Sequence, residues 1–206
     1  NTGYYIQRGR AVLCLDILIT VIAFTIVRYT NSVVSLLQKS SSQLETDSLT
    51  KLHSRPFIYE KAKDLIHNAD TNRPVSMAIV DLDHFKRVND TYGHDNGDVV
   101  LRSFGELITR YISDKFDAGR FGGEKFILLF DGMTAEEAYA YLDKMRLEFS
   151  EIRYPFCKES VTFSSGLVTI TSPLTFKSMF TLVDQALYHS KENGRNQITV
   201  EHYRSR

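Results

Sequence analysis

A nearly continuous apolar run, VSMAIVDLD at residues 75–83, restricts the fold more than any other segment of the chain. Its length and its lack of regular polar alternation are typical of a strand that is buried on both faces. Such a strand needs packed structure on each side of its sheet. We therefore expect 75–83 to be a central strand of a sheet that helices cover.

Helical and extended patterns alternate from residue 47 to about residue 201. Glycines at 122 and 123 separate two apolar stretches, which predicts a β-hairpin over 116–130. The predicted fold class is α/β, an α+β sandwich with a mixed central β-sheet flanked by helices. We expect helices at 55–67, 98–111, 134–149 (opened by a capping box of Thr134 and Glu137) and 176–194, and further strands at 161–170 and 197–201.

The segment before this domain has a different character. Residues 11–27, AVLCLDILITVIAFTIV, are apolar on every side of a helix, and Asp16 is their only charge. With Tyr29, an interfacial residue, the segment reaches the short end of membrane-spanning length. A buried helix of a soluble domain is the alternative, and the cost of a mid-membrane carboxylate favours it. However, nothing nearby could bury such a helix on all faces.

We therefore predict three parts. Residues 1–29 hold the last transmembrane helix of a sensor region, 30–46 form a helical connector, and 47–206 form one folded domain. The 25 basic and 25 acidic residues balance, which argues against a general nucleic-acid partner. Cys14 and Cys157 match neither a metal-binding nor a disulfide pattern.

Four polar clusters have the residue types for ligand chemistry, and each also has an ordinary structural explanation. Asp81-Leu82-Asp83 ends the apolar run, where carboxylates suit Mg²⁺, although most such pairs are caps or surface residues. The second cluster is rich in amides and carboxylates that suit a purine edge, or else a turn and a helix cap. It contains Phe85, Lys86, Asn89, Asp90, Gly93, His94, Gly97 and Asp98.

The third cluster is the hairpin tip, where Gly122 and Gly123 let backbone N–H groups approach a phosphate and Glu124 is placed to share a cation with Asp81. An ordinary tight hairpin is the alternative. In the fourth, Lys191 and Arg195 lie one helical turn apart, as a phosphate clamp or as a solvated helix end.

Together, in this order, the motifs resemble the GGDEF family, the diguanylate cyclases, over essentially all of residues 47–200. This resemblance implies a nucleotidyl-cyclase, palm-like fold. The motifs are DSLTKLHSRPF (47–57), DLDHFKRVNDTYGHDNGD (81–98), RFGGEKF (120–126), VTFSSG (161–166) and DQALYHSKENGRN (184–196).

The resemblance also implies roles. The positions matching Asp81, the backbone carbonyl of Leu82 and Glu124 hold Mg²⁺ (or Mn²⁺) against GTP, and those matching Asn89 and Asp98 recognise guanine. The substrate-binding set is completed by Lys191 and Arg195 on the outer phosphates, by backbone N–H groups around Phe85 and Lys86, and by His94.

Two departures from the family pattern matter. Lys125 stands where the signature has a second acid, which changes the local charge by two units; its side chain either points outward or contacts phosphate. Ser113 and Phe116 replace the Arg and Asp of the family's inhibitory site, so we expect no product inhibition there.

The resemblance implies a diguanylate cyclase that condenses two GTP into cyclic di-GMP, with Asp81 and Glu124 as its catalytic acids. It would act as a homodimer through the GGDEF domain and the connector helix. The alternative, which Lys125 raises, is a catalytically impaired domain that serves as a GTP-binding receptor or a regulatory interaction domain. We expect membrane attachment through residues 11–29, at the inner (cytoplasmic) membrane, with the GGDEF domain in the cytoplasm.

Overall fold

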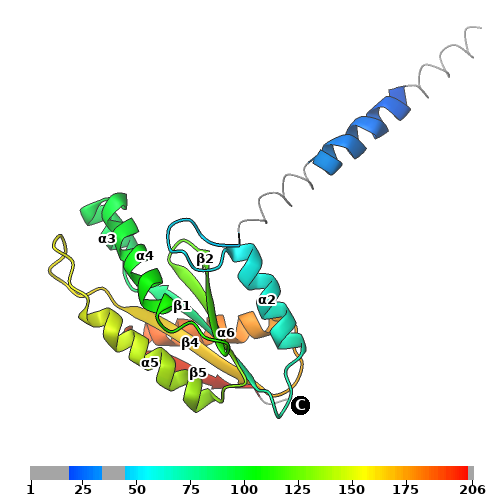
Figure 1. The fold of residues 1–206 in the computed structure, drawn as a ribbon. Coiled ribbons are helices and arrows are strands. Elements are labelled where there is room, and N and C mark those ends of the chain that lie inside the picture. The colour runs from blue at the N-terminus through cyan, green and yellow to red at the C-terminus, as the bar shows by residue number, and fades with distance from the viewer. Residues whose placement is uncertain (1–18, 34–44, 204–206) are drawn as a thin grey trace, which may run out of the picture. The chain divides into compact units, whose positions relative to one another are not determined.

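The computed structural model describes residues 19–33 and 45–203, and the chain divides into two units, 1–44 and 45–206. Residues 19–33 of the first unit are helical (Figure 1). Within the described ranges, no helix combines the length and the apolar character that crossing a membrane requires. The predicted span at 11–27 and the predicted connector at 30–46 lie partly outside the described residues.

The second unit contains a five-stranded sheet in the order β2-β3-β1-β4-β5. Its central strand is β1 (Val75–Leu82), and every residue of β1 is buried, as its apolar run predicts. Antiparallel neighbours flank it on both sides, β3 (Lys125–Asp131) and β4 (Phe163–Ile170). At the edges, β2 (Phe116–Gly122) pairs antiparallel with β3, and β5 (Ile198–His202) pairs parallel with β4.

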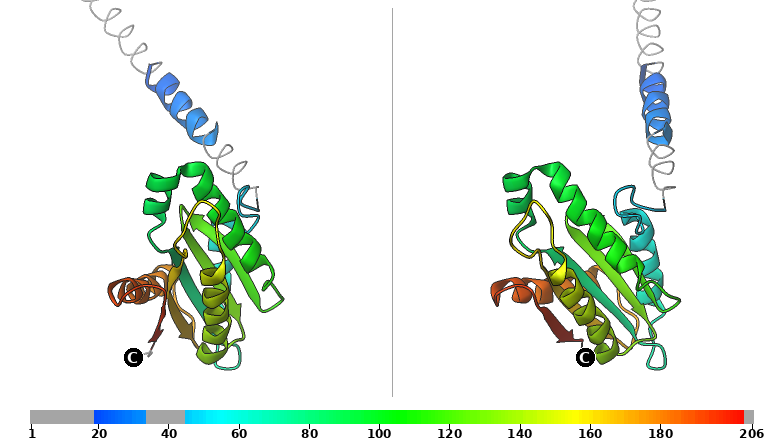
Figure 2. Two further views of the ribbon diagram at one scale, coloured as in Figure 1. Left: turned by 90° about the vertical axis from the view of Figure 1, so that its left-hand side faces the viewer. Right: turned by 60° about the vertical axis from the view of Figure 1, so that its left-hand side comes forward.

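Helices cover both faces of this mixed sheet, which confirms the predicted fold class. Figures 1 and 2 show α4 and α5 on one face and α2 and α6 on the other, and two separate apolar cores match these layers. The helices are α2 (Arg55–His67), α3 (Phe85–Tyr92), α4 (His94–Thr109), α5 (Ala135–Glu151) and α6 (Phe176–Glu192).

The alternation of side chains along β1 decides toward which face of the sheet Asp81 points. Ala78 and Val80 pack in the core under α4 and α5, whereas Met77 and Ile79 pack in the core under α2 and α6. Successive residues of a strand point to opposite faces. Asp81 therefore points to the α6 face.

The predicted helix at 98–111 begins too late, because the structure has two helices, α3 and α4, over 85–109. The stretch is rich in Asn, Asp and Gly, which favour turns and caps over helix interiors when the sequence is considered alone. Burial of Phe85 and Val88 in the core supplies the missing stability. Gly93, with φ of 86°, separates the two helices.

Gly166 of β4 sets how closely α6 approaches the sheet. A β carbon at this position would lie 2.2 Å from the Val183 carbonyl oxygen and 2.4 Å from the Leu187 nitrogen, which are backbone atoms. We predict that Gly166→Ala lowers the free energy of unfolding by about 3 kcal/mol, because α6 must move away from the sheet. Urea denaturation measures this, and a loss below about 0.5 kcal/mol would contradict the prediction.

Candidate functional site

The site is centred on Asp81, which lies near the end of β1 and is only 5% exposed. The Lys191 ammonium of α6 lies 2.7 Å from Asp81 Oδ1. In the sheet, Asp81 is paired with Lys125 of β3, and the Leu82 N–H donates a 3.3 Å hydrogen bond to the Glu124 carbonyl. The end of β1 thus brings together the acids that the motifs at 81 and 124 place far apart in sequence.

The electrostatics of Asp81 reflect this burial. Desolvation is the largest effect on Asp81, and its pKa is raised above the ordinary value although the hydrogen bond and the charge of Lys191 lower it. The charge of Glu124 raises the pKa of Asp81 further, and the charge of Lys125 lowers it. Asp81 and Glu124 are therefore close enough to interact, and a cation between them would relieve both the repulsion and the cost of burial.

Lys125 has a partner outside this pair of acids. Its ammonium lies 3.3 Å from Asp184 Oδ1 of α6, and both side chains are partly exposed. Lys125 therefore extends toward α6. Its charge nevertheless acts on Asp81.

The acids fit a divalent cation only with further ligands from a substrate. Among the described residues, no three His, Cys, Asp or Glu side chains are grouped so that they could hold a metal. Mg²⁺ in nucleotide sites typically takes one or two carboxylates and completes its coordination with phosphate oxygens and water. Asp81 and Glu124 match that donor set, provided that Lys191 yields its contact with Asp81.

The Asp81-Leu82-Asp83 cluster divides in the structure. Asp83 is buried, and its carboxylate accepts hydrogen bonds from the Thr162 and Ser164 hydroxyls at 2.7 and 2.6 Å. It also accepts the Asn196 N–H at 3.0 Å. These donors satisfy Asp83 internally, so of the two acids in the cluster Asp83 has a structural role.

The second cluster forms the α3–α4 corner. A β carbon at Gly97 would lie 1.9 Å from Asn89 Oδ1. The Asn89 amide therefore packs against Gly97, the residue before Asp98. Phe85 and Lys86 begin α3, where unpaired backbone N–H groups favour an anion. His94, at the start of α4, is exposed.

The prediction that Lys191 and Arg195 lie one helical turn apart is wrong. Lys191 is in the last turn of α6, but the helix ends at Glu192. Gly194, with φ of 107°, and Arg195, with φ of 63°, turn the chain away, because left-handed backbone cannot continue a right-handed helix. Arg195 therefore lies in a loop beyond the end of α6.

The positions of the family's inhibitory motif carry no charge. Ser113 and Phe116 pair through two backbone hydrogen bonds at the start of β2, and the Phe116 side chain is buried in the core. A hollow of about 780 Å³ lies nearby. Two of its lining groups, the Arg110 guanidinium and the Tyr111 hydroxyl, already bind Glu148. Burial, and then the hydrogen bond and charge of Glu148, raise the pKa of Tyr111 to about 12.

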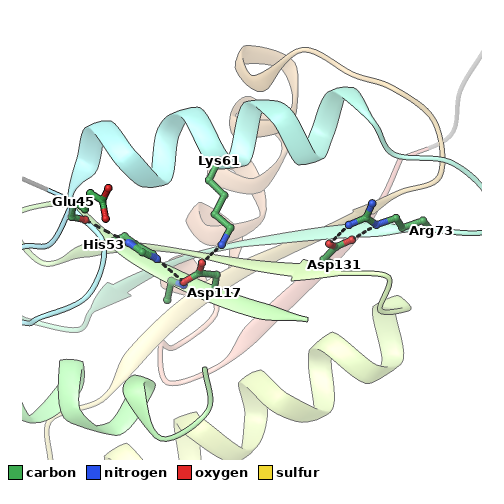
Figure 3. Close-up of polar contacts among 7 residues, drawn as sticks. Glu45, His53, Lys61, Arg73, Asp117 and Asp131 are labelled. Carbon is green, nitrogen blue, oxygen red and sulfur yellow. Dashed lines mark hydrogen bonds and ion pairs between the residues drawn. The ribbon is translucent and has the colours of Figure 1, made fainter. Parts of the chain in front are cut away.

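Sequence reasoning missed the way in which residues 45–54 attach to β2. Figure 3 shows His53 and Lys61 on either side of Asp117, and His53 Nε2 lies 3.1 Å from an Asp117 oxygen. Next along β2, Arg120 donates to the Gly123 carbonyl at 2.9 Å and lies 3.4 Å from Asp47. The start of the domain is therefore tied directly to the glycine turn of the site.

Comparison with known proteins agrees with this fold. Residues 44–197 match the family described as "Diguanylate cyclase, GGDEF domain". "Diguanylate cyclase A" of Treponema denticola is 32% identical over 168 residues, which are 80% of this chain and 45% of that protein. A diguanylate cyclase of Vibrio cholerae is 33% identical over 172 residues, 82% of this chain and 53% of that protein. The chain thus spans about half the length of these relatives.

Solved structures of GGDEF domains have the same fold as this chain. The GGDEF domain of DgcB from Caulobacter crescentus, crystallised in complex with c-di-GMP, matches with a TM-score of 0.70 and 32% identity, over 76% of this chain and 95% of that chain. The mixed sheet and its helical layers are thus those of a palm-like α/β domain. The chain belongs to the GGDEF family, the family of the diguanylate cyclases.

Proposed function

We propose that this chain is a diguanylate cyclase that joins two GTP molecules into cyclic di-GMP and releases two pyrophosphates. The observation that carries the proposal is the meeting of Asp81 and Glu124 at neighbouring strand ends, with Lys191 of α6 on Asp81. A buried carboxylate kept beside a second acid is costly for a structural site, even with a lysine to offset part of the cost. Such an arrangement is suited to a metal-nucleotide complex, and relatives of the chain are diguanylate cyclases.

Each group then has a role. Asp81, the Leu82 carbonyl and Glu124 would hold Mg²⁺ or Mn²⁺, which neutralises phosphate charge when bound. Lys191 moves from Asp81 to the outer phosphates, where Arg195 joins it, and the N–H groups that open α3 donate to phosphate oxygens. The Asn89 amide and the Asp98 carboxylate would hydrogen-bond the guanine edge, with the exposed His94 nearby in sequence at the start of α4.

The reaction needs two domains. The 3′-hydroxyl of one GTP attacks the α-phosphorus of the other, the bond to pyrophosphate breaks, and a second transfer closes the ring. Each domain presents one GTP, so two copies must face each other, and positioning supplies much of the rate. The tie between residues 45–54 and the glycine turn supports control of this arrangement through the preceding connector.

A second candidate function is favoured by Lys125. With a positive charge beside Asp81, the domain would bind GTP without turning it over and would signal through its contacts. Incubation of the purified protein with GTP and Mg²⁺, followed by mass spectrometry, separates the two functions. Cyclic di-GMP supports the cyclase, GTP binding without product supports the receptor, and absence of binding refutes both.

Product feedback gives a further prediction. We expect cyclic di-GMP at about 10 μM, roughly tenfold above a micromolar dissociation constant, to have little effect. GTP turnover, or GTP affinity, should stay unchanged within about twofold. The reason is that Ser113 and Phe116 offer no charged group to this ligand, while Arg110 is held by Glu148. Turnover at increasing cyclic di-GMP measures this, and inhibition at submicromolar concentration would overturn it.

We also propose that residues 11–29 attach the chain to the inner (cytoplasmic) membrane, with the catalytic domain in the cytoplasm where GTP is available. The apolar run and its interfacial Tyr29 support this proposal. A fusion of residues 1–46 to a fluorescent protein should remain with membranes after a high-salt or carbonate wash. Release of the fusion by the wash would contradict the proposal.

A further inference from the structure

The loop that follows α6 holds a costly backbone conformation. Arg195 and Asn196 have φ angles of 63° and 45°, in the left-handed region that residues with a β carbon seldom adopt. Two such residues in succession persist only where their surroundings hold them. Because Arg195 is one of the residues proposed to bind phosphate, the groups that hold this loop bear on the site.

Asp83 holds the loop from the sheet side. Its carboxylate accepts the Asn196 N–H at 3.0 Å, and the same oxygen accepts the Thr162 hydroxyl at 2.7 Å. The other oxygen accepts the Ser164 hydroxyl at 2.6 Å, so the carboxylate cannot rotate freely. The backbone N–H of Asp83 also donates a 2.8 Å hydrogen bond to the Thr162 carbonyl.

Arg146 of α5 holds the loop from the opposite side. Its guanidinium donates to the Asn196 carbonyl at 3.1 Å and to the Asn196 side-chain oxygen at 3.0 Å. Asp143, 2.7 Å away on the same helix, orients the guanidinium. Asn196 is thus held at its N–H, its carbonyl and its side chain, while the neighbouring Arg195 side chain remains exposed.

We propose that Asp83 and Arg146 are positioning residues that fix Arg195 for the outer phosphates of GTP, an inference that rests on the proposed function. Asp83 and Arg146 together form a clamp on the loop. Because Asp83 lies two residues after Asp81, at the end of the same strand, the clamp sets the position of Arg195 relative to the proposed metal acids. A loop held in advance loses less conformational entropy when the nucleotide binds. The second acid of the Asp81-Leu82-Asp83 cluster serves the site through Arg195, without touching a metal.

The test uses Asp83→Ala and Arg146→Gln, with Arg153→Gln as the matched control, because Arg153 caps the end of α5 through Ser150 and is not in the loop contacts. GTP and GMP affinities are measured by calorimetry with Mg²⁺. Hydrogen exchange of residues 193–197 is measured without nucleotide. We expect each clamp variant to weaken GTP about tenfold, as loss of a charge-assisted phosphate contact does, and GMP less than about twofold. Exchange in the loop should rise.

Three results would overturn the inference: equal losses for GTP and GMP, unchanged loop exchange, or a full effect of Arg146→Gln when Arg195 is already alanine. Should Asp83→Ala fail to fold, Arg146→Gln on the half-buried side of α5 carries the test. The exchange measurement needs no nucleotide. A wild-type protein that bound no GTP would therefore refute the proposed function, while loop exchange would still decide whether the clamp holds the loop.

Discussion

Lys125→Glu should raise the rate of cyclic di-GMP formation about a hundredfold. Lys125 is the cross-strand partner of Asp81, and its charge acts on that carboxylate. Two unit charges about 6 Å apart interact by about 3 kcal/mol at an effective dielectric constant of 20, before the partial exposure of Lys125 reduces the effect. Replacing repulsion of a divalent cation by attraction changes the local charge by two units. Initial rates with GTP and Mg²⁺ measure the gain.

Two controls separate charge at the site from charge in general. Lys125→Gln removes the positive charge and the contact with Asp184 without adding an acid, so about a tenfold gain is expected. Lys177→Glu makes the same charge change on the exposed first turn of α6, fourteen residues before Lys191 and about 20 Å along the helix, and should change the rate less than twofold. Equal rates for wild type and Lys125→Glu would show that Lys125 does not limit the chemistry.

The sheet and most helices were predictable because their signals are local. The apolar run at 75–83 contains β1, every residue of which is buried, and the capping box of Thr134 and Glu137 opens α5 with both of its hydrogen bonds formed. Helix α3 was missed because its sequence favours turns, and only burial of Phe85 and Val88 against distant residues stabilises it. A contact of this kind leaves no local pattern.

The site shows the same division. The motifs place Asp81 and Glu124 at strand ends, and the alternation along β1 puts Asp81 on the face of Lys191. The internal role of Asp83 was not predictable, because its partners Thr162 and Asn196 are distant in sequence. The partner of Lys125 was unpredictable for the same reason, since Asp184 comes from another element.

Asp81→Asn should lower turnover about a thousandfold or more through loss of a proposed metal ligand, and should also stabilise the fold. Burial raises the folded-state pKa of Asp81 above its ordinary value of 3.8. Between the pKa of Asp81 in the unfolded chain and its raised pKa in the folded protein, the folded protein keeps a proton that the unfolded chain releases. The stability contributed by this carboxyl therefore falls as pH rises through that range. At neutral pH the charged form therefore opposes folding.

The neutral amide removes that cost, so the free energy of unfolding should rise by about 1 kcal/mol, a typical gain when a functional site is relieved. Thermal unfolding without nucleotide should show a Tm about 3 °C higher at neutral pH, and the gain should shrink in acid, where Asp81 is already protonated. Asp83→Asn is the contrasting variant. Its carboxylate accepts hydrogen bonds from Thr162, Ser164 and Asn196, so loss of its charge should lower stability. A lower Tm for Asp81→Asn would mean that Lys191 pays back the burial of this carboxylate in full, and that the site is held together by its ion pair.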